Sequence, residues 1–185
     1  MHIFQPRNPS RILAQPAAER LPLFICYANC SRSVIAKYLY EQLGGPALSA
    51  GVVAGSGVNA CAVAMLKAWG IEVTGHTPRQ LDRALCDAAD GLFVLVPDFL
   101  PQLLRDHGVD LATKTFLFAD PFTLPRSLSD ATYNVLDPAF DPRPFDEVLH
   151  AYAWMRERVQ QIRAELCRPG TNLIPASRYL DVLGI

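Results

Sequence analysis

The chain has 185 residues, of which 50% are hydrophobic, a formal net charge of −1 at pH 7 and five cysteines. This length predicts a single domain with a sizeable core, and neither the net charge nor the longest apolar runs indicate nucleic acid or a membrane as a partner. An odd number of cysteines without regular spacing favours free thiols in a reducing compartment, so we expect a cytoplasmic protein.

The chain begins with a segment that resembles neither a core element nor a signal peptide. Residues 1–20 contain three prolines and no apolar run of the length that a signal peptide requires. We interpret them as an N-terminal extension that lies along the surface or is partly disordered.

A strand, a loop and a helix follow. The apolar run at residues 23–25 predicts a buried strand, and apolar residues at helical spacing predict a helix over residues 34–43. Gly44-Gly45 ends this helix, because glycine tolerates the left-handed conformation of helix termini. The loop between them is CYANCSRS, residues 26–33, which places a cysteine at the strand end and an arginine six positions later.

This loop has the features of an anion-binding site. A loop that leads into a helix N-terminus turns backbone N–H groups inward, and the helix dipole also favours negative charge there. We expect these amides and the guanidinium of Arg32 to stabilise the thiolate of Cys26, which makes it nucleophilic at neutral pH. Arg32 also presents a planar fork that matches two phosphate oxygens. The alternative, a buried structural cysteine and a surface arginine, fits the flanking strand and helix less well.

Strands and helices alternate along the chain. The expected strands cover residues 23–25, 47–52, 92–96 and 115–118. The expected helices cover residues 34–43, 60–69, 81–89, 98–107 and 145–166. This alternation predicts an α/β fold, a single-domain three-layer sandwich with a four-stranded parallel sheet, helices on both faces and the phosphate-binding loop after the first strand. Ligands bind at the carboxyl ends of the strands in such sheets, which is where Cys26 lies.

The loop CYANCSRS resembles the phosphate-binding loop of the low-molecular-weight protein tyrosine phosphatases, whose usual form is C-x-G-N-x-C-R-S. Ala28 replaces the usual glycine, and Cys30-Ser31 stands where the family has an apolar residue and then a cysteine. The matching residues are Cys26, Asn29, Arg32 and Ser33. The resemblance implies that the whole loop binds phosphate, namely Tyr27, Ala28, Asn29, Cys30, Ser31, Arg32 and Ser33.

Further motifs agree with the family in their order along the chain. Ser49-Ala50-Gly51 matches the motif that follows the second strand of the family. His76 precedes Arg79-Gln80-Leu81, as a histidine does in the family before a similar run. The resemblance implies that His76 braces Asn29 in the phosphate-binding loop.

A phosphatase also needs an acid that protonates the leaving oxygen. Two Asp-Pro pairs compete for this role, Asp120-Pro121 after the fourth strand and Asp137-Pro138 before the last helix. The family's acid belongs to a D-P-aromatic motif at the second place, so the resemblance implies Asp137. Ala139 stands where the family has its first aromatic residue after D-P, and Phe140 occupies the next position. The resemblance therefore implies a pocket with fewer aromatic side chains around a phenyl phosphate.

The resemblance implies hydrolysis of a phosphomonoester, in particular protein phosphotyrosine, through a phosphocysteine intermediate. Cys26 attacks phosphorus, Arg32 holds the phosphate oxygens and Asp137 protonates the leaving group. Ser33 hydrogen-bonds the thiolate. No metal or organic cofactor is implied. The implied partners are a phosphorylated protein or a small phosphomonoester, with inorganic phosphate or another oxyanion as ligand, and the oligomeric state is left open.

The resemblance extends over residues 21–167, interpreted as one domain, and leaves residues 168–185 as a C-terminal tail. Residues 57–71 are closer to the thioredoxin-coupled arsenate reductases, which share the fold. Arsenate reduction of that kind uses two more cysteines after the third strand, and no cysteine occurs between Val96 and Leu166. A form coupled to glutathione or mycothiol stays open.

Three other functions have weaker support in the sequence. A non-catalytic module that binds phosphoanions is favoured by Ala28 and by the smaller number of aromatic side chains in the pocket. The pattern G-x-G-x-x-A at residues 55–60 is a weak dinucleotide fingerprint, and a rim loop explains it better. A zinc site at Cys26 and Cys30 lacks a second pair of ligands at zinc spacing.

Overall fold

The computed structural model describes residues 20–119, 135–168 and 173–178 of the chain. At its centre is one parallel sheet whose strands lie in the order β2-β1-β3-β4. The strands are β1 Pro22–Cys26, β2 Leu48–Gly51, β3 Gly91–Val94 and β4 Thr115–Leu117. The predicted four-stranded parallel sheet is confirmed, and the strand ends differ from the prediction by about one or two residues.

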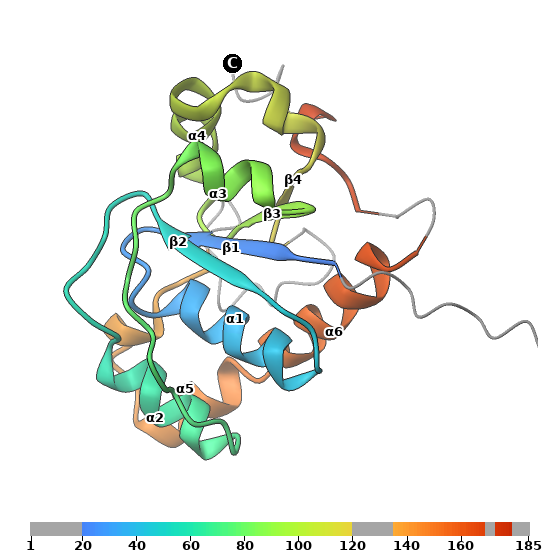
Figure 1. The fold of residues 1–185 in the computed structure, drawn as a ribbon. Helices are drawn as coiled ribbons and strands as arrows, with labels where there is room; N and C mark the ends of the chain where they lie inside the picture. The colour runs from blue at the N-terminus through green and yellow to red at the C-terminus, as the bar shows by residue number, and fades with distance from the viewer. Residues whose placement is uncertain (1–19, 120–134, 169–172, 179–185) are drawn as a thin grey trace, which may run out of the picture.

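Helices cover both faces of this sheet. They are α1 Arg32–Gln42, α2 Ala60–Ala68, α3 Arg83–Ala88, α4 Leu100–His107, α5 Phe145–Ala151 and α6 Trp154–Leu166. Short 3₁₀ turns are η1 Pro97–Phe99, η2 Val109–Thr113, η4 Pro138–Phe140 and η5 Ala176–Arg178. Figure 1 shows α1, α2, α5 and α6 on one side of the sheet and α3 and α4 on the other, which is the predicted three-layer arrangement.

The long helix expected over residues 145–166 is wrong in one respect, because the structure has two helices there. α5 and α6 are separated at Tyr152 and Ala153. At the break the backbone bonds tighten to i→i−3 pairs, such as the Ala153 N–H to the His150 carbonyl at 3.2 Å. The helical spacing of apolar residues continues from α5 into α6 without interruption, so the sequence pattern does not indicate two helices.

The helix expected to begin at Asp98 also differs. Pro97–Phe99 forms the 3₁₀ turn η1, and α4 starts at Leu100 without a side-chain cap. Proline at the start of each segment explains this, because Pro97 and Pro101 have no N–H to place in the hydrogen-bond ladder.

Alternation along β1 decides where the loop cysteine points. Successive side chains of a strand face opposite sides of the sheet. Leu23 and Ile25 pack into the core on the side of α3 and α4, whereas Phe24 and Cys26 pack into the core on the side of α1 and α6. Both sides are covered, which is why the strand is apolar throughout. Cys26 therefore faces α1 from the carboxyl end of β1, and β2 and β3 lie on opposite sides of this strand. Such a switch point is where ligands bind in α/β sheets.

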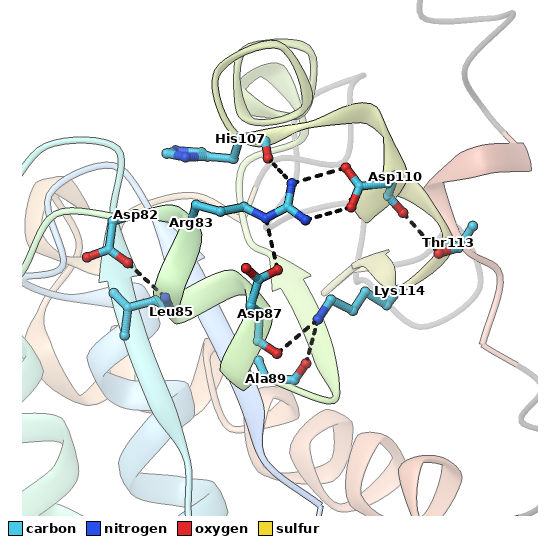
Figure 2. A network of polar contacts seen from close by, with 9 residues as sticks. All are labelled: Asp82, Arg83, Leu85, Asp87, Ala89, His107, Asp110, Thr113 and Lys114. Carbon is cyan, nitrogen blue, oxygen red and sulfur yellow. Dashed lines mark hydrogen bonds and ion pairs between the residues drawn. The ribbon is translucent and has the colours of Figure 1, made fainter.

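A polar network on the side of α3 and α4 joins these helices to the segment before β4 (Figure 2). Arg83 donates to Asp87 on its own helix at 2.9 Å and forms a bidentate pair with Asp110 of η2 at 3.1 and 2.7 Å. It also donates to the His107 carbonyl at the end of α4, at 2.6 Å. These contacts hold the C-terminal end of α4, the helix that follows directly on Phe99.

Both ends of the described domain contact its sheet or its connections. Arg20 pairs with Asp90 at 3.0 Å, and Pro175 forms a β-bridge with Phe116 of β4. Residues 1–19, nearly all of the predicted N-terminal extension, lie outside the described residues. Within the described ranges, no helix is long and apolar enough to cross a membrane.

Candidate active site

One buried asparagine holds the loop between β1 and α1. Asn29 adopts φ +55°, in the left-handed region that asparagine tolerates better than most residues. Its amide nitrogen donates to the Ser33 hydroxyl at 2.9 Å, and its side-chain oxygen accepts from the Arg79 backbone N–H at 3.1 Å. His76 Nε2 lies 3.3 Å from the Asn29 carbonyl oxygen. The loop is thus fastened both to α1 and to the connector before α3.

Burial lowers the pKa of His76, so the imidazole is neutral at pH 7. A neutral ring with its proton on Nε2 donates to the Asn29 carbonyl without placing a charge beside the loop. This state suits a supporting role better than proton transfer.

Cys26 lies at the base of the loop and is 2% exposed. Its Sγ is 3.0 Å from the Ser33 hydroxyl oxygen. Because that oxygen already accepts from Asn29, its hydrogen is available to the sulfur. The sulfur thus has a hydrogen-bond partner in the first turn of α1, where the helix dipole also favours negative charge.

Arg32 spans from this loop to the segment before α5. Its guanidinium donates to the Val135 carbonyl at 3.0 Å and pairs with the Asp137 carboxylate at 3.2 Å. Arg32 Nε and the Ser31 hydroxyl are both buried and have no hydrogen-bond partner among the described residues. Buried donors are normally paired, so an oxyanion in the loop would supply the acceptor that these groups lack.

The segment around Asp137 is itself held in place. Asp137 caps η4, and its carboxylate accepts from the Ala139 N–H at 3.1 Å. The Val135 N–H donates to the Leu95 carbonyl at 2.9 Å, directly beyond the end of β3. These bonds hold the Asp137 carboxylate beside the Arg32 guanidinium at the loop. The two segments involved lie more than 100 residues apart in the sequence, since Arg32 bonds to Val135.

Tyr152 is a supporting residue that sequence reasoning missed. Its hydroxyl donates to the Leu136 carbonyl at 3.1 Å from the break between α5 and α6. Burial and the nearby carboxylates of Asp141 and Asp137 raise its pKa, so the hydroxyl keeps its proton. In the sequence Tyr152 is one more apolar position of an amphipathic pattern, and nothing distinguishes it from a core residue.

The model of the low molecular weight phosphotyrosine protein phosphatase family matches residues 22–168. The chain belongs to this family. The resemblance that the loop motif indicated is confirmed, and membership of this family makes the chain a phosphate-ester hydrolase. A comparison with curated proteins gives no match.

Solved structures support the fold of this phosphatase. Wzb of Vibrio vulnificus in complex with benzylphosphonate is 23% identical, with a TM-score of 0.64 over 78% of this chain and 97% of that one. Wzb of Escherichia coli K30 in complex with sulphate is also 23% identical, with a TM-score of 0.64 over 80% and 98%. The YwlE arginine phosphatase of Geobacillus stearothermophilus is 23% identical, with a TM-score of 0.63 over 88% and 96%. At this identity the likeness concerns the fold alone.

The predicted site residues of the phosphatase that the structure describes meet at the carboxyl edge of the sheet. They are Cys26, Tyr27, Ala28, Asn29, Cys30, Ser31, Arg32, Ser33, His76 and Asp137. Asp120, the competing acid, lies outside the described residues. Besides Tyr152, sequence reasoning missed the backbone groups of Arg79 and Val135, because a backbone donor or acceptor has no residue signature.

Cys30 of the phosphatase contacts other groups than Cys26 does. Its thiol donates to the Ala28 carbonyl at 3.2 Å, and a Cβ atom added at Gly55 would overlap its sulfur. The Gly55 N–H donates to the same carbonyl at 2.9 Å, so the loop after β2 closes over this thiol. A side chain at position 55 would therefore have to displace the Cys30 sulfur from its observed place.

This geometry bears on oxidation by peroxide. A disulfide needs Cβ atoms that face each other, and the Cys26 and Cys30 sulfurs have different partners. We expect peroxide to inactivate the enzyme with poor recovery in dithiothreitol, because Cys26 passes beyond sulfenic acid. Peptide mapping after mild oxidation measures this. A dominant Cys26–Cys30 disulfide with full thiol recovery would refute it.

Proposed function

We propose that this phosphatase hydrolyses phosphomonoesters with Cys26 as nucleophile, Arg32 as oxyanion clamp and Asp137 as general acid. The contact of Arg32 with Asp137 at 3.2 Å carries the proposal, because it sets the clamp and the acid together at the loop that contains the thiol. Arg32 Nε, which has no acceptor among the described residues, supports it further, since a bound phosphate oxygen would accept from it.

The chemistry then needs two displacements. The Cys26 sulfur attacks phosphorus, the bond to the ester oxygen breaks, and Asp137 gives that oxygen its proton. Water next attacks the phosphocysteine, Asp137 takes a proton from it, and the phosphorus–sulfur bond breaks. Thiolate and inorganic phosphate are the products. Ser33 stabilises the thiolate in both steps through its hydroxyl, 3.0 Å from the sulfur.

The proposed substrate is a phosphorylated protein, in particular one with phosphotyrosine, or a small phosphomonoester. Solved members of the fold have been seen with phosphate, sulphate and benzylphosphonate, which supports a phosphoanion ligand here. A cytoplasmic setting is proposed because all five cysteines are free thiols. Hydrolysis of p-nitrophenyl phosphate, run beside arsenate reduction with several thiol donors, tests the reaction. Arsenate reduction without phosphate release would overturn the proposal.

Asp137→Asn is expected to make turnover depend more strongly on the leaving group. The asparagine cannot donate an acidic proton, so kcat/KM on a phosphate with a poor leaving group is expected to fall on the order of 10²-fold. For p-nitrophenyl phosphate, whose phenolate leaves without a proton, a much smaller loss is expected. The measurement is kcat/KM across a series of leaving groups.

Asp141→Asn is the matched control for this series. Asp141 lies on the same segment, but its carboxylate is held by Arg143 at 2.9 Å. Its variant is expected to keep the leaving-group dependence of the wild type. If Asp120→Asn and not Asp137→Asn steepens that dependence, the acid has been assigned to the wrong pair.

A further inference from the structure

Exposed apolar side chains surround the phosphate-binding loop. Tyr27 follows Cys26 directly, and its carbonyl accepts from the Val53 N–H at 3.0 Å. Leu136 directly precedes Asp137. The exposed fractions of Tyr27, Val53 and Leu136 are 51%, 40% and 42%. Apolar groups gathered around a polar site indicate that the ligand has an apolar part.

Tyr27 differs from its neighbours because its ring is held in place. The ring centroid lies 5.6 Å from that of Phe99, with the planes inclined by 32°. Phe99 is half-buried at the end of η1, and its N–H donates to the Val96 carbonyl at 3.1 Å. The following helix, α4, is held at its far end by the Arg83 network shown in Figure 2. Phe140, at 86% exposure, packs against far less of the protein.

We propose that Tyr27, braced by Phe99, is the surface on which the leaving group of the substrate lies, and that it gives this enzyme a preference for aryl over alkyl phosphates. The inference rests on the proposed function, since an attack by Cys26 places the leaving group opposite the sulfur, at the mouth of the loop. Tyr27 contacts the substrate and determines specificity. Phe99 is a positioning residue that acts through Tyr27.

The physical reason is the flat face of the tyrosine ring. Aromatic rings attract one another in offset and tilted arrangements beyond the effect of buried area. A ring that is already ordered loses little conformational freedom when a second ring binds. On the other side of the site, Ala139 follows Asp137-Pro138 with only a methyl group, so that position supplies no ring. We therefore expect Tyr27 to be the residue that makes the site prefer aryl over alkyl leaving groups.

The test compares kcat/KM for phenyl phosphate and ethyl phosphate in each variant relative to wild type. Tyr27→Ala is expected to lower the value for phenyl phosphate by about three- to tenfold more than the value for ethyl phosphate, mainly through KM. Tyr27→Phe keeps the ring and is expected to keep the wild-type ratio. Phe99→Ala is expected to raise KM for phenyl phosphate while kcat is retained, which a general loss of structure would not produce.

Phe140→Ala is the matched control, because it removes an aromatic ring that is 86% exposed. Its ratio of aryl to alkyl turnover is expected to stay that of the wild type. Equal losses on both substrates in Tyr27→Ala, or a larger aryl-specific loss in Phe140→Ala, would overturn the inference. Failure of the proposed function looks different, because the wild-type enzyme would then release phosphate from neither substrate.

Discussion

Cys26→Ser is expected to abolish the release of phosphate from an aryl phosphate while the fold stays intact. A serine hydroxyl is a far weaker nucleophile than a thiolate at neutral pH, and the loss of a covalent nucleophile costs roughly 10⁴–10⁶-fold in kcat. The smaller oxygen can still contact the Ser33 hydroxyl, which lies 3.0 Å from the sulfur, so Tm is expected to change little. Steady-state kinetics and a thermal melt measure the two effects.

Cys167→Ser is the matched control for this substitution. Cys167 follows α6 at its C-cap and is half-buried, away from the loop. Its variant is expected to turn over substrate at the wild-type rate. Wild-type turnover in Cys26→Ser would mean that another group attacks phosphorus.

Arg32→Lys is expected to be the next most damaging change. The guanidinium reaches the Val135 carbonyl and the Asp137 carboxylate with two nitrogens, and its Nε finds no acceptor in the part of the chain that the structure describes. A lysine ammonium is a point charge that cannot make these bonds together, so kcat is expected to fall by roughly 10³–10⁵-fold. The inhibition constant of inorganic phosphate, measured in the same variant, reports the loss of ground-state binding.

Arg83→Lys controls for the change of arginine to lysine as such. Arg83 lies in the exposed network on the side of α3 and α4 (Figure 2), so its variant is expected to keep wild-type kcat. If kcat of Arg32→Lys equalled kcat of Arg83→Lys, Arg32 would not be the residue that holds the phosphate oxygens.

Most of the fold and the position of the loop follow from local patterns that the sequence displays. The apolar run of β1, ended by Cys26, and the glycines after Leu43 mark a strand and a helix by their composition. The alternation of β1 then fixes the face on which Cys26 lies, because Phe24 must be buried on the same side. These are properties of neighbouring residues, which is why a single sequence reveals them.

The contacts that the sequence does not reveal are long-range or concern the backbone. The bond from Tyr152 to the Leu136 carbonyl depends on a break between α5 and α6 that the apolar periodicity conceals. The direction of the Cys30 thiol depends on Gly55, in a loop that the sequence marks only as flexible. The pairing of Arg32 with Asp137 joins segments whose approach follows from the whole topology.

In the proposed mechanism, the phosphoryl group passes through a covalent bond to Cys26. Asp137→Asn should slow breakdown of the intermediate, because the same carboxylate activates water in the second step. Acid-quenched Asp137→Asn enzyme, taken during turnover of p-nitrophenyl phosphate, can be digested and analysed by mass spectrometry. We expect the mass of one phosphoryl group on the peptide that contains Cys26, and on no other peptide. A burst of p-nitrophenol with an unmodified Cys26 peptide, or with phosphate on another residue, would contradict it.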